Sequence, residues 1–454
     1  MSATSRHESP KSLGDAQKPL ADAPKSLGDA RKPLADAQKS LASAQKSLAE
    51  VGEGLRRRVG GARVAYVCAD PGIGVFGTKG ASVHVQEVVR VLRAAGADVV
   101  LHATRTGGEP PADLADVVVQ LLPTRPRGGD VREREAWLIA QDDAIADAVD
   151  LAGTDLLYER YSLFSAAALE RARAAGIPTV LEVNAPLVDE QAAHRGLVHA
   201  DAAWESLRRA VTAADVVTCV SEPVAAWVRE HVPGARTVVA ANGVNTERIR
   251  PREAHEPRET PDVPTIGFVG TLKPWHGVEV LLEAAAPLVR DGVARLLIVG
   301  DGPLAADLDA RAVELGITAG VERTGATDPA DVPALLRRTD VAVAPYPAVA
   351  EEYFSPLKVY EYLAAGLPVV ASAVGQIPAV VRDGVTGVLL PPSDVVALRD
   401  ALELLCAHAP TRERMGRAAR ADAVEHHGWE RTVATAIEAL PPTVLDLLTA
   451  EESA

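Results

Sequence analysis

The chain has 454 residues, 47% of them hydrophobic and 24% charged, and its formal net charge is −15. This length exceeds the size at which one hydrophobic core stops growing, so we expect two domains. The acidic balance argues against nucleic acid as a partner, because such a protein repels a phosphate backbone. The sequence has no apolar run of about 18 residues and no secretory signal, so we expect a cytoplasmic protein without a transmembrane segment. Peripheral membrane contact and the oligomeric state are left open.

Residues 1–60 carry a seven-residue repeat in which each lysine is followed two positions later by a leucine. Leucines with alanines three positions further on form a heptad seam, but Pro19, Pro24 and Pro33 each disfavour a helix by about 3 kcal/mol. Only the stretch from Leu34 to about residue 58 could form a short amphipathic helix. We interpret residues 1–60 as a low-complexity heptad-repeat tail rather than an oligomerisation or membrane helix.

Residues 61–244 alternate short apolar runs with stretches of helical periodicity, which predicts a Rossmann-like domain with a parallel sheet. Gly96 is placed to end the first of these helices in the left-handed conformation. A helix within 430–454 is expected to complete this domain. The strand-like runs are RVAYVCA, DVVLHAT, DLLYER (155–160), PTVLEV (178–183), DVVTCV (215–220) and RTVVAA (236–241).

Residues 245–263 are polar and proline-rich, which is typical of a linker. A second α/β series then occupies residues 264–429. Two Rossmann-like halves place a ligand crevice between them, at the carboxyl ends of both sets of strands. The strand-like runs of this half are PTIGFVG (264–270), RLLIVG (295–300), VERTG (321–325), DVAVAP (340–345), LPVVAS (367–372) and GVLLP (387–391).

The three cysteines, Cys68, Cys219 and Cys406, lie far apart, each within an apolar run. Buried cysteine behaves as a small hydrophobic residue, and these spacings fit no metal-binding pattern. We therefore expect three buried thiols with no metal role.

The first strand is followed by a glycine-rich loop in which Gly72, Gly74 and Gly77 spell G-x-G-x-x-G, the dinucleotide fingerprint. The helical period begins only near Ser82, so the loop is longer than that fingerprint allows. We interpret the loop as a mobile lip of the cleft. Its candidate cleft-side residues are Gly77, Gly80 and His84, although a lone histidine there could equally be a packed core residue.

In the second half, Gly270 follows a strand and a cation, Lys273, stands in the loop before a helix. Glycine lets the backbone approach a ligand, and a cation near a helix N-terminus suits a diphosphate. Gly302 lies in a second tight turn facing the same crevice, where simple turn chemistry is the main expectation.

The segment from Tyr353 to Pro368 is the densest in candidate side chains. We expect Ser355 to cap a helix that begins at Pro356 and ends before Gly366. The free amides of its first turn would face the cleft. Beside them Lys358 would add charge for a phosphate, and Glu361 could accept hydrogen bonds from ribose hydroxyls.

Residues from about 61 to 430 resemble retaining glycosyltransferases of family 4, a family with the GT-B fold. The resemblance rests on co-ordered stretches in both halves: YERYSLFS (158–165), LEVNAPL (181–187), VSE (220–222), ANGVN (241–245), GFVGTLKPWHG (267–277), VGDGP (299–303), YFSPLKVYEYLAAGLPVVAS (353–372) and GQIPAVVRDGVTGVLLPP (375–392).

The resemblance implies two Rossmann-like domains facing across a cleft and transfer of a hexose-type sugar from a nucleotide-diphosphate sugar to an acceptor. It implies retention of anomeric configuration and no cofactor or metal. Many members have two glutamates separated by seven residues. Glu361 matches the second, and Tyr353 stands where the first would be, with Glu351 and Glu352 just before it.

Members of the family commonly place a basic pair on the diphosphate, where this chain has Thr271 and His276. We expect Lys273 and Lys358 to supply that charge, and Asn184 to lie near the acceptor. The candidate catalytic residues are Lys273, Lys358 and Glu361. The candidate donor-binding residues are Gly270, Thr271, His276, Gly302, Tyr353, Ser355, Pro356 and Leu357.

Two alternatives stay open. One is a GT-B enzyme that epimerises its nucleotide sugar without an acceptor. The other is an NADP-linked oxidoreductase that uses the Gly72-Gly74-Gly77 loop, with Arg105 on the 2′-phosphate. Asp307 and Asp309 superficially resemble a metal-binding pair, but we interpret them as a solvated helix face.

Overall fold

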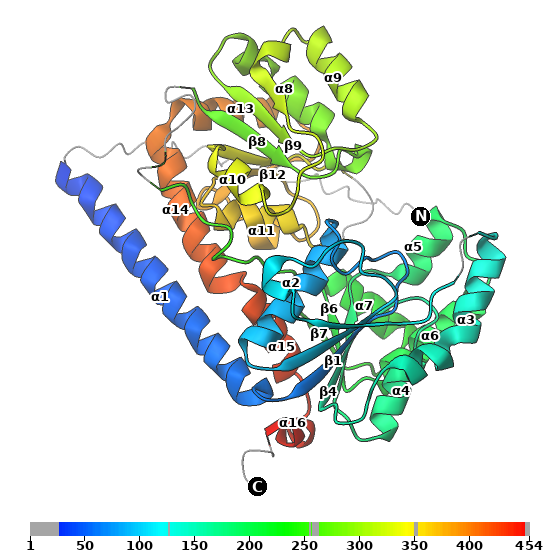
Figure 1. The fold of residues 1–454 in the computed structure, drawn as a ribbon. Helices are drawn as coiled ribbons and strands as arrows, with labels where there is room; N and C mark the ends of the chain where they lie inside the picture. Colours follow the sequence, from blue (N-terminus) through cyan, green and yellow to red (C-terminus); the bar gives the residue numbers. More distant parts are fainter. Residues whose placement is uncertain (1–26, 126–127, 254–255, 257–262, 349–352, 450–454) are drawn as a thin grey trace, which may run out of the picture.

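The computed structural model describes residues 27–125, 128–253, 256, 263–348 and 353–449, with side chains from residue 39 onward. Within these residues the chain forms two α/β halves, each built around a parallel sheet (Figure 1). The predicted fold class of two Rossmann-like domains is therefore confirmed.

The first half holds a sheet with the order β3-β2-β1-β4-β5-β6-β7, and all of its strand pairs are parallel. In register, Tyr66 of β1 lies opposite Tyr158 of β4, and their rings stack at 5.4 Å. The strands are β1 (Arg63–Cys68), β2 (Asp98–Ala103), β3 (Val118–Leu121), β4 (Leu156–Arg160), β5 (Thr179–Val183), β6 (Val216–Cys219) and β7 (Thr237–Val239).

Helices cover both faces of this sheet because each presents one apolar stripe to it. In α2 the residues Val85, Val88, Val89 and Leu92 are buried, and the helix ends at Ala95 before Gly96, whose φ is +92°. The helices of this half are α2 (Gly80–Ala94), η1 (Ala112–Leu114), α3 (Val131–Ala148), α4 (Ala167–Ala174), α5 (Leu187–His194), α6 (Ala200–Ala213) and α7 (Glu222–His231).

The second half repeats the arrangement with a sheet of the order β10-β9-β8-β11-β12-β13. Its strands are β8 (Thr265–Val269), β9 (Arg295–Val299), β10 (Val321–Arg323), β11 (Val341–Ala344), β12 (Val369–Ser372) and β13 (Gly387–Leu390). Its helices are η2 (Pro274–His276), α8 (Val278–Arg290), α9 (Ala305–Glu314), η3 (Thr318–Gly320), α10 (Val332–Arg337), α11 (Leu357–Ala364), α12 (Ile377–Val380), α13 (Val395–Ala407) and α14 (Ala409–His426).

Both sheets have the doubly wound order, so each has a switch point where the chain reverses direction across the sheet. Those points lie between β1 and β4 in the first half and between β8 and β11 in the second. Ligands of open α/β sheets bind outside the carboxyl ends of the strands at such points. The loops after β1, β4, β8 and β11 are therefore the place to look for a site.

The chain crosses between the halves twice, at neighbouring positions. Val244 pairs with Gly428 in an isolated parallel bridge, and the amide of Val244 donates to the carbonyl of His427 at 2.7 Å. After this crossing, α15 (Trp429–Glu438) returns to the first half, where its apolar side chains join the core beneath β1 and α2. A last helix, α16 (Pro442–Thr449), follows it.

Within residues 1–60 the structure describes residues 27–59, and the helix considered possible from Leu34 to about residue 58 extends further toward the N-terminus. Residues 27–59 form one helix, α1 (Leu27–Val59), which lies along α14 and contacts α15 and α16 (Figure 1). Ala44, Leu55 and Val59 of its seam are buried. The helix runs through Pro33, because packing of the seam further along outweighs the local cost of one proline. Residues 1–26 lie outside the described chain.

The prediction for the cysteines is confirmed, since Cys68, Cys219 and Cys406 are all free and buried. Burial raises the pKa of the Cys68 and Cys219 thiols to about 12 and that of Cys406 to about 11. The thiols are therefore neutral and unreactive in the folded protein.

Candidate functional site

The loops that follow β8 and β9 pack on each other through glycines. Gly270 has a φ of +148°, and a β-carbon there would lie 2.8 Å from Nζ of Lys358. A β-carbon on Gly300 would meet the carbonyl oxygen of Gly270 at 2.1 Å, and one on Gly302 would meet the backbone of Leu272. Gly302 thus serves backbone packing, while Gly270 leaves room for the lysine at the switch point.

Lys358 is the second residue of α11 and is only 9% exposed. Its ammonium lies 4.3 Å from the centre of the Phe268 ring and 5.1 Å from that of Tyr346. Within the described chain its Nζ has no hydrogen-bond partner. Burial lowers its pKa to about 7, against the opposing attraction of Glu361. A buried cation without a partner favours an anionic ligand.

Glu361 lies one turn further along α11 and is half-buried. Burial raises its pKa to about 7; Arg248 opposes that rise, Glu87 adds to it and Lys358 opposes it. Glu87 belongs to α2 of the first half and Arg248 to the crossing segment. Glu361 therefore faces the boundary between the two halves.

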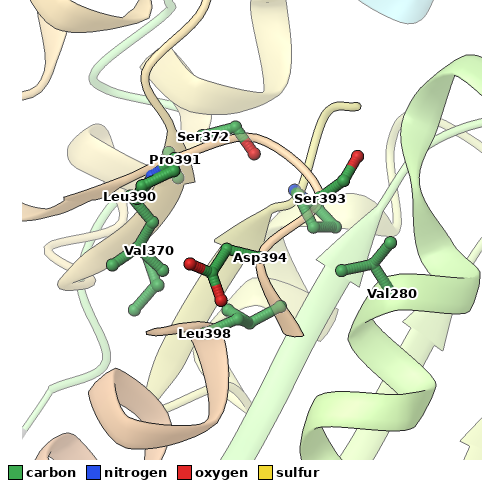
Figure 2. A pocket seen from close by; sticks show the side chains of 10 residues that line it. Val280, Val370, Ser372, Leu390, Pro391, Ser393, Asp394 and Leu398 are labelled. Carbon is green, nitrogen blue, oxygen red and sulfur yellow. The ribbon is translucent and has the colours of Figure 1, made fainter. Parts of the chain in front are cut away.

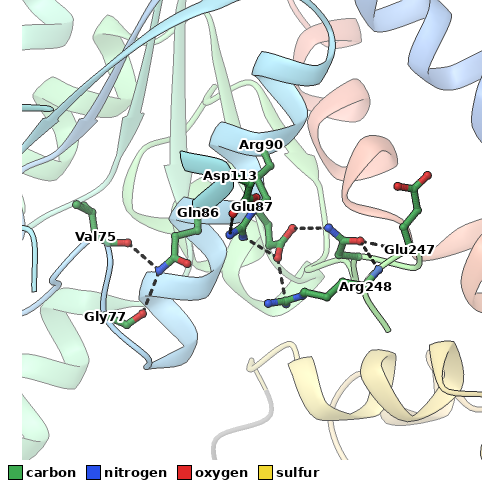
Figure 3. Close-up of polar contacts among 9 residues, drawn as sticks. Val75, Gly77, Gln86, Glu87, Arg90, Asp113, Glu247 and Arg248 are labelled. Atoms are coloured by element: carbon green, nitrogen blue, oxygen red, sulfur yellow. Dashed lines mark hydrogen bonds and ion pairs between the residues drawn. The ribbon is translucent and has the colours of Figure 1, made fainter. Parts of the chain in front are cut away.

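The group opposite Glu361 is a buried ion-pair cluster around Glu87, which is 1% exposed (Figure 3). One carboxylate oxygen receives Arg90 at 3.0 Å and Arg248 at 3.1 Å, and the other accepts from the amide of Asn245 at 3.3 Å. These contacts tie α2 to the segment that leads into the second half. Glu87 and Arg248 were not among the predicted site residues. For Glu87 there was a signal in the sequence, because it is a charged residue on the buried stripe of a predicted helix.

Lys273, His276 and Lys358 converge at the start of α8. The Lys273 ammonium lies 4.6 Å from the Trp275 ring, and Nδ1 of His276 contacts the carbonyl of Thr271. Burial and the two nearby ammonium groups lower the pKa of His276 to about 4. The imidazole is therefore neutral near pH 7, and the lysines carry the positive charge here.

The expected cap at Ser355 is wrong. Helix α11 begins at Leu357 after Pro356, and no side chain caps it. The hydroxyl of Ser355 instead accepts from the backbone amide of Asn242 at 3.2 Å and contacts the Tyr360 hydroxyl at 3.2 Å. Its hydroxyl is committed to holding the chain before the helix, so the first-turn amides of α11 are left without a side-chain cap.

Two neighbours of Ser355 connect the halves. The hydroxyl of Tyr353 donates to the carboxylate of Glu190 on α5, and its ring packs on the core of the first half. Leu357 packs on the other core of that half, and a β-carbon on Gly80 would lie 3.3 Å from it. The starts of α2 and α11 therefore lie against each other. Glu351 and Glu352 lie outside the described residues.

The glycine-rich loop of the first half is folded onto the loop after β2. A β-carbon on Gly74 would lie 2.5 Å from Cα of Gly107, and the carbonyl of Gly77 accepts from Gln86 at 3.0 Å (Figure 3). In a dinucleotide fingerprint these glycines make room for a pyrophosphate. Here protein backbone fills the space at Gly74, and α2 begins only at Gly80, which argues against the NADP-linked alternative.

His84 and Asn184, the two side chains expected on the acceptor side, meet at one carboxylate, Glu182. Nε2 of His84 lies 2.8 Å from Oε2, and Nδ2 of Asn184 donates to Oε1. Arg160 reaches Oε1 at 2.8 Å and the Tyr158 hydroxyl reaches Oε2 at 3.2 Å. Burial alone would raise the pKa of Glu182, but His84, Arg160 and Asn184 hold it at about 2.

The sequence analysis did not select Glu182 or Arg160, although both stand in the quoted stretches LEVNAPL and YERYSLFS. Each is a charged residue at the carboxyl end of a fully buried strand. Burying a charge is costly unless it is paired, so such positions predict a partner. Spacing in the sequence did not show which partner.

The pair Asp307 and Asp309 lies on α9, where Asp309 forms an exposed ion pair with Arg323 at 2.6 Å. Within the described ranges no group of three or more His, Cys, Asp or Glu side chains is arranged to hold a metal ion. In the same residues, no helix combines the length and apolar character needed to cross a bilayer.

A small pocket lies at the carboxyl ends of β12 and β13, beside the start of α13 (Figure 2). Its empty volume of about 210 Å³ includes space that is open to solvent. Apolar side chains line it, with Ser372, Ser393 and Asp394 as polar members, and Asp394 already caps α13 by accepting from the amide of Ala397. The pocket therefore gives no separate site for a whole nucleotide sugar.

The fold defines a two-domain α/β protein built from two Rossmann-like halves, with the buried ammonium of Lys358 left without a hydrogen-bond partner among the described residues. A family model described as Glycosyltransferase Family 4 matches residues 78–248, and one described as Glycosyl transferases group 1 matches residues 263–408. The chain belongs to glycosyltransferase family 4 and has the GT-B fold.

Relatives and solved structures agree with this family. Over 213 residues the chain is 34% identical to the D-inositol 3-phosphate glycosyltransferase of Mycobacterium avium, a match that covers 44% of this chain and 48% of that protein. The chain thus spans about half the length of the curated relatives it matches.

Two solved structures share the fold across nearly their whole length. Sucrose-phosphate synthase from Thermosynechococcus elongatus has a TM-score of 0.62 at 22% identity, with 83% of this chain and 97% of that chain covered. The Anabaena protein HepE in complex with UDP-glucose has a TM-score of 0.55 at 18% identity, with 83% and 98% covered. At these identities the likeness concerns the fold alone.

Proposed function

We propose that this protein transfers a hexose-type sugar from a nucleotide-diphosphate sugar to an acceptor hydroxyl, with retention of anomeric configuration and without a metal ion. The observation that carries the proposal is the buried, unpartnered ammonium of Lys358 beside Gly270. Family membership supports the reaction class, and the HepE structure holds UDP-glucose on the same fold.

The leaving diphosphate gains negative charge as the glycosidic bond breaks, so the enzyme must stabilise that charge. Lys358 supplies a cation in a place shielded from water, where electrostatic attraction is strong. The uncapped amides of the first turn of α11 point along the same helix axis, and helix N-termini bind phosphate. Lys273 adds a second, more exposed charge, and Thr271, His276 and Gly302 shape the loop around them.

Glu361 is assigned to the ribose hydroxyls of the donor. Its carboxylate is half-buried at the domain boundary, and a ligand hydroxyl would supply hydrogen bonds that the described side chains do not. Tyr353 stands where many members have their donor-sugar glutamate, and its contact with Glu190 places it between the halves. Asn184, Gly77 and Gly80 are assigned to the acceptor side, where buried His84 contacts Glu182.

The test begins with thermal unfolding in the presence of UDP-glucose, other UDP and GDP sugars, and NADP. A donor that stabilises the folded state should raise the melting temperature with concentration. Stabilisation by NADP and by no nucleotide sugar would overturn the proposal.

The best donor is then incubated with and without acceptor, starting with the D-inositol 3-phosphate named in the mycobacterial relatives. We expect a glycosylated product whose anomeric configuration, read by NMR coupling constants, equals that of the donor. Epimerised nucleotide sugar formed from donor alone would favour the epimerase alternative. An inverted product would contradict retention.

A further inference from the structure

A continuous line of polar contacts crosses from the first half to the start of α11. It runs from Glu182 on β5 to His84 on α2, then to Asn242 in the crossing segment and to Ser355 before α11. His84 Nε2 lies 2.8 Å from Glu182, and Nδ1 lies 2.7 Å from Oδ1 of Asn242. The side-chain NH₂ group of Asn242 donates to the backbone carbonyl of Ser355 at 2.9 Å. We call these four residues the His84 link.

The partners of His84 fix the direction of the link. A carbonyl oxygen only accepts, so the Asn242 group that faces Ser355 must be its NH₂, and Oδ1 must face His84. Nδ1 of His84 is therefore the donor to Oδ1 of Asn242, at 2.7 Å. Within the described chain, Nε2 lies at ion-pair distance from Glu182 but is not aligned for a hydrogen bond.

The geometry points to a specific role: His84 joins the acceptor-side carboxylate Glu182 to the donor-side chain at Ser355 through Asn242. This inference rests on the proposed function for the meaning of those two sides. His84 is then a positioning residue, which touches neither substrate and acts through Asn242 on the place where α11 begins.

The surroundings of His84 support a fixed ring. It is 3% exposed, and the Trp429 ring from α15 packs edge-to-face with it at 4.8 Å between centres. Arg160 also pairs with Glu182, at 2.8 Å. Asn242 also donates its backbone amide to Ser355, which gives the link two bonds to the segment that precedes Lys358.

The direction of the link is tested by NMR of the full chain with ¹⁵N-labelled histidine. The His84 signal is assigned by its loss in His84→Gln. We expect a proton on Nδ1, which is the nitrogen that faces Asn242. A ring whose only proton is on Nε2 overturns the inference, whatever reaction the enzyme performs.

The positioning role is tested by hydrogen exchange of the amides in residues 355–366. His84→Gln should speed their exchange, and Asn242→Ala should do the same, because both break the link. The matched control is His199→Gln, since His199 pairs with another buried carboxylate of the same half, Glu135, at 3.0 Å. Equal exchange in wild type and His84→Gln, or an equal change in His199→Gln, would sink the assignment.

Donor binding supplies a third measurement, with UDP-glucose titrated by calorimetry. His84→Gln and Asn242→Ala should each weaken binding by about tenfold, the loss expected when a hydrogen bond to a charged group is removed. The dissociation constant of the double variant should lie within about twofold of that of the weaker-binding single variant, because the two residues form one link. If wild type binds no nucleotide sugar, the proposed function fails, while the NMR and exchange results still decide the role of His84.

Discussion

Two carboxylates, one in each half, differ sharply in their surroundings. Glu182 on β5 has Arg160, His84, Asn184 and Tyr158 around it, and its pKa is about 2. Glu361 on α11 is also withdrawn from water, but Arg248, the cation that lowers its pKa most, already pairs with Glu87, and the pKa of Glu361 is about 7. Burial pushes both values upward, so the partners decide the outcome.

The difference separates two uses of buried charge. The first half completes its polar cluster within the protein, which fixes the loops after β4 and β5. The second half leaves Lys358 and Glu361 incompletely satisfied at the cleft, which costs stability and leaves both groups ready for a ligand. Four predictions follow from this contrast.

Glu182→Ala should have the largest effect, because it leaves Arg160 buried without its partner. Breaking a buried ion pair typically costs about 3–5 kcal/mol, and we expect that loss in the free energy of unfolding measured in urea. Glu361→Ala is the matched comparison and should change stability by less than about 1 kcal/mol. Equal losses in the two variants would remove the contrast between the halves.

Lys358→Met should reduce turnover and yet stabilise the protein without ligand. Loss of one group that stabilises charge in a transition state costs about 2.7–4 kcal/mol, so kcat should fall by roughly a hundredfold or more. The variant also relieves the cost of burying an ammonium, so its melting temperature should rise. Lys273→Met is the control that shares the charge but not the burial, and it should not gain stability.

The sign of the pH dependence for Lys358 follows from its pKa of about 7 in the folded protein against a usual 10.5. Between these values the unfolded chain binds more protons, so this group makes wild-type stability rise with pH. At pH 7 and below, the full desolvation cost is present. The gain from Lys358→Met should therefore be largest near pH 6 and fade toward pH 10.

Glu361→Gln should weaken donor use more modestly, because a neutral amide can still contact a hydroxyl. We expect kcat/KM to fall by about tenfold to a hundredfold, since hydrogen bonds to charged groups are worth about 1.5–3 kcal/mol. The pKa of Glu361 is about 7 in the folded state against a usual 4.5, so its contribution to stability falls as pH rises between these values. In urea unfolding, the free energy of unfolding of wild type should therefore lose this contribution between pH 5 and pH 7, and the glutamine variant should not show that loss.

His276→Asn should have the smallest effect. Because the pKa of His276 is lowered to about 4, the ring carries no charge to lose near pH 7. We expect kcat to stay within about threefold of wild type and no rise in wild-type activity as the pH falls from 8 to 6. A hundredfold loss, with activity rising toward acid pH, would show that His276 is the phosphate cation instead of the lysines.

Local sequence patterns predicted most of the fold. The buried strands read as short apolar runs, and the glycines that end α2 and α11, Gly96 and Gly366, adopt the left-handed conformation expected of them. The edge strand β3 was missed because Val118 and Leu121 are 54% and 66% exposed. An edge strand with little burial lacks the apolar pattern from which a strand is predicted.

Distant contacts decided the structure in two places where local patterns were read. Ser355 had the right position for a helix cap, but Asn242 and Tyr360 use its hydroxyl. The heptad seam near the N-terminus looked like a tail because its prolines disfavour a helix, while the surface of α14 and α15 that stabilises α1 lies at the far end of the chain. In both cases the deciding partner was too distant in sequence to be recognised.

The sequence by itself determined the two doubly wound halves, the buried thiols, and the presence of Lys358 and Glu361 on one helix, because periodicity and turn residues act over a few positions. Only the tertiary structure decided how the charges are paired. Asn242 lies 158 positions after His84, and Glu361 meets Arg248 and Glu87 only where the two halves come together. Ionisation depends on burial and on the nearest opposite charge, and both are properties of the folded chain.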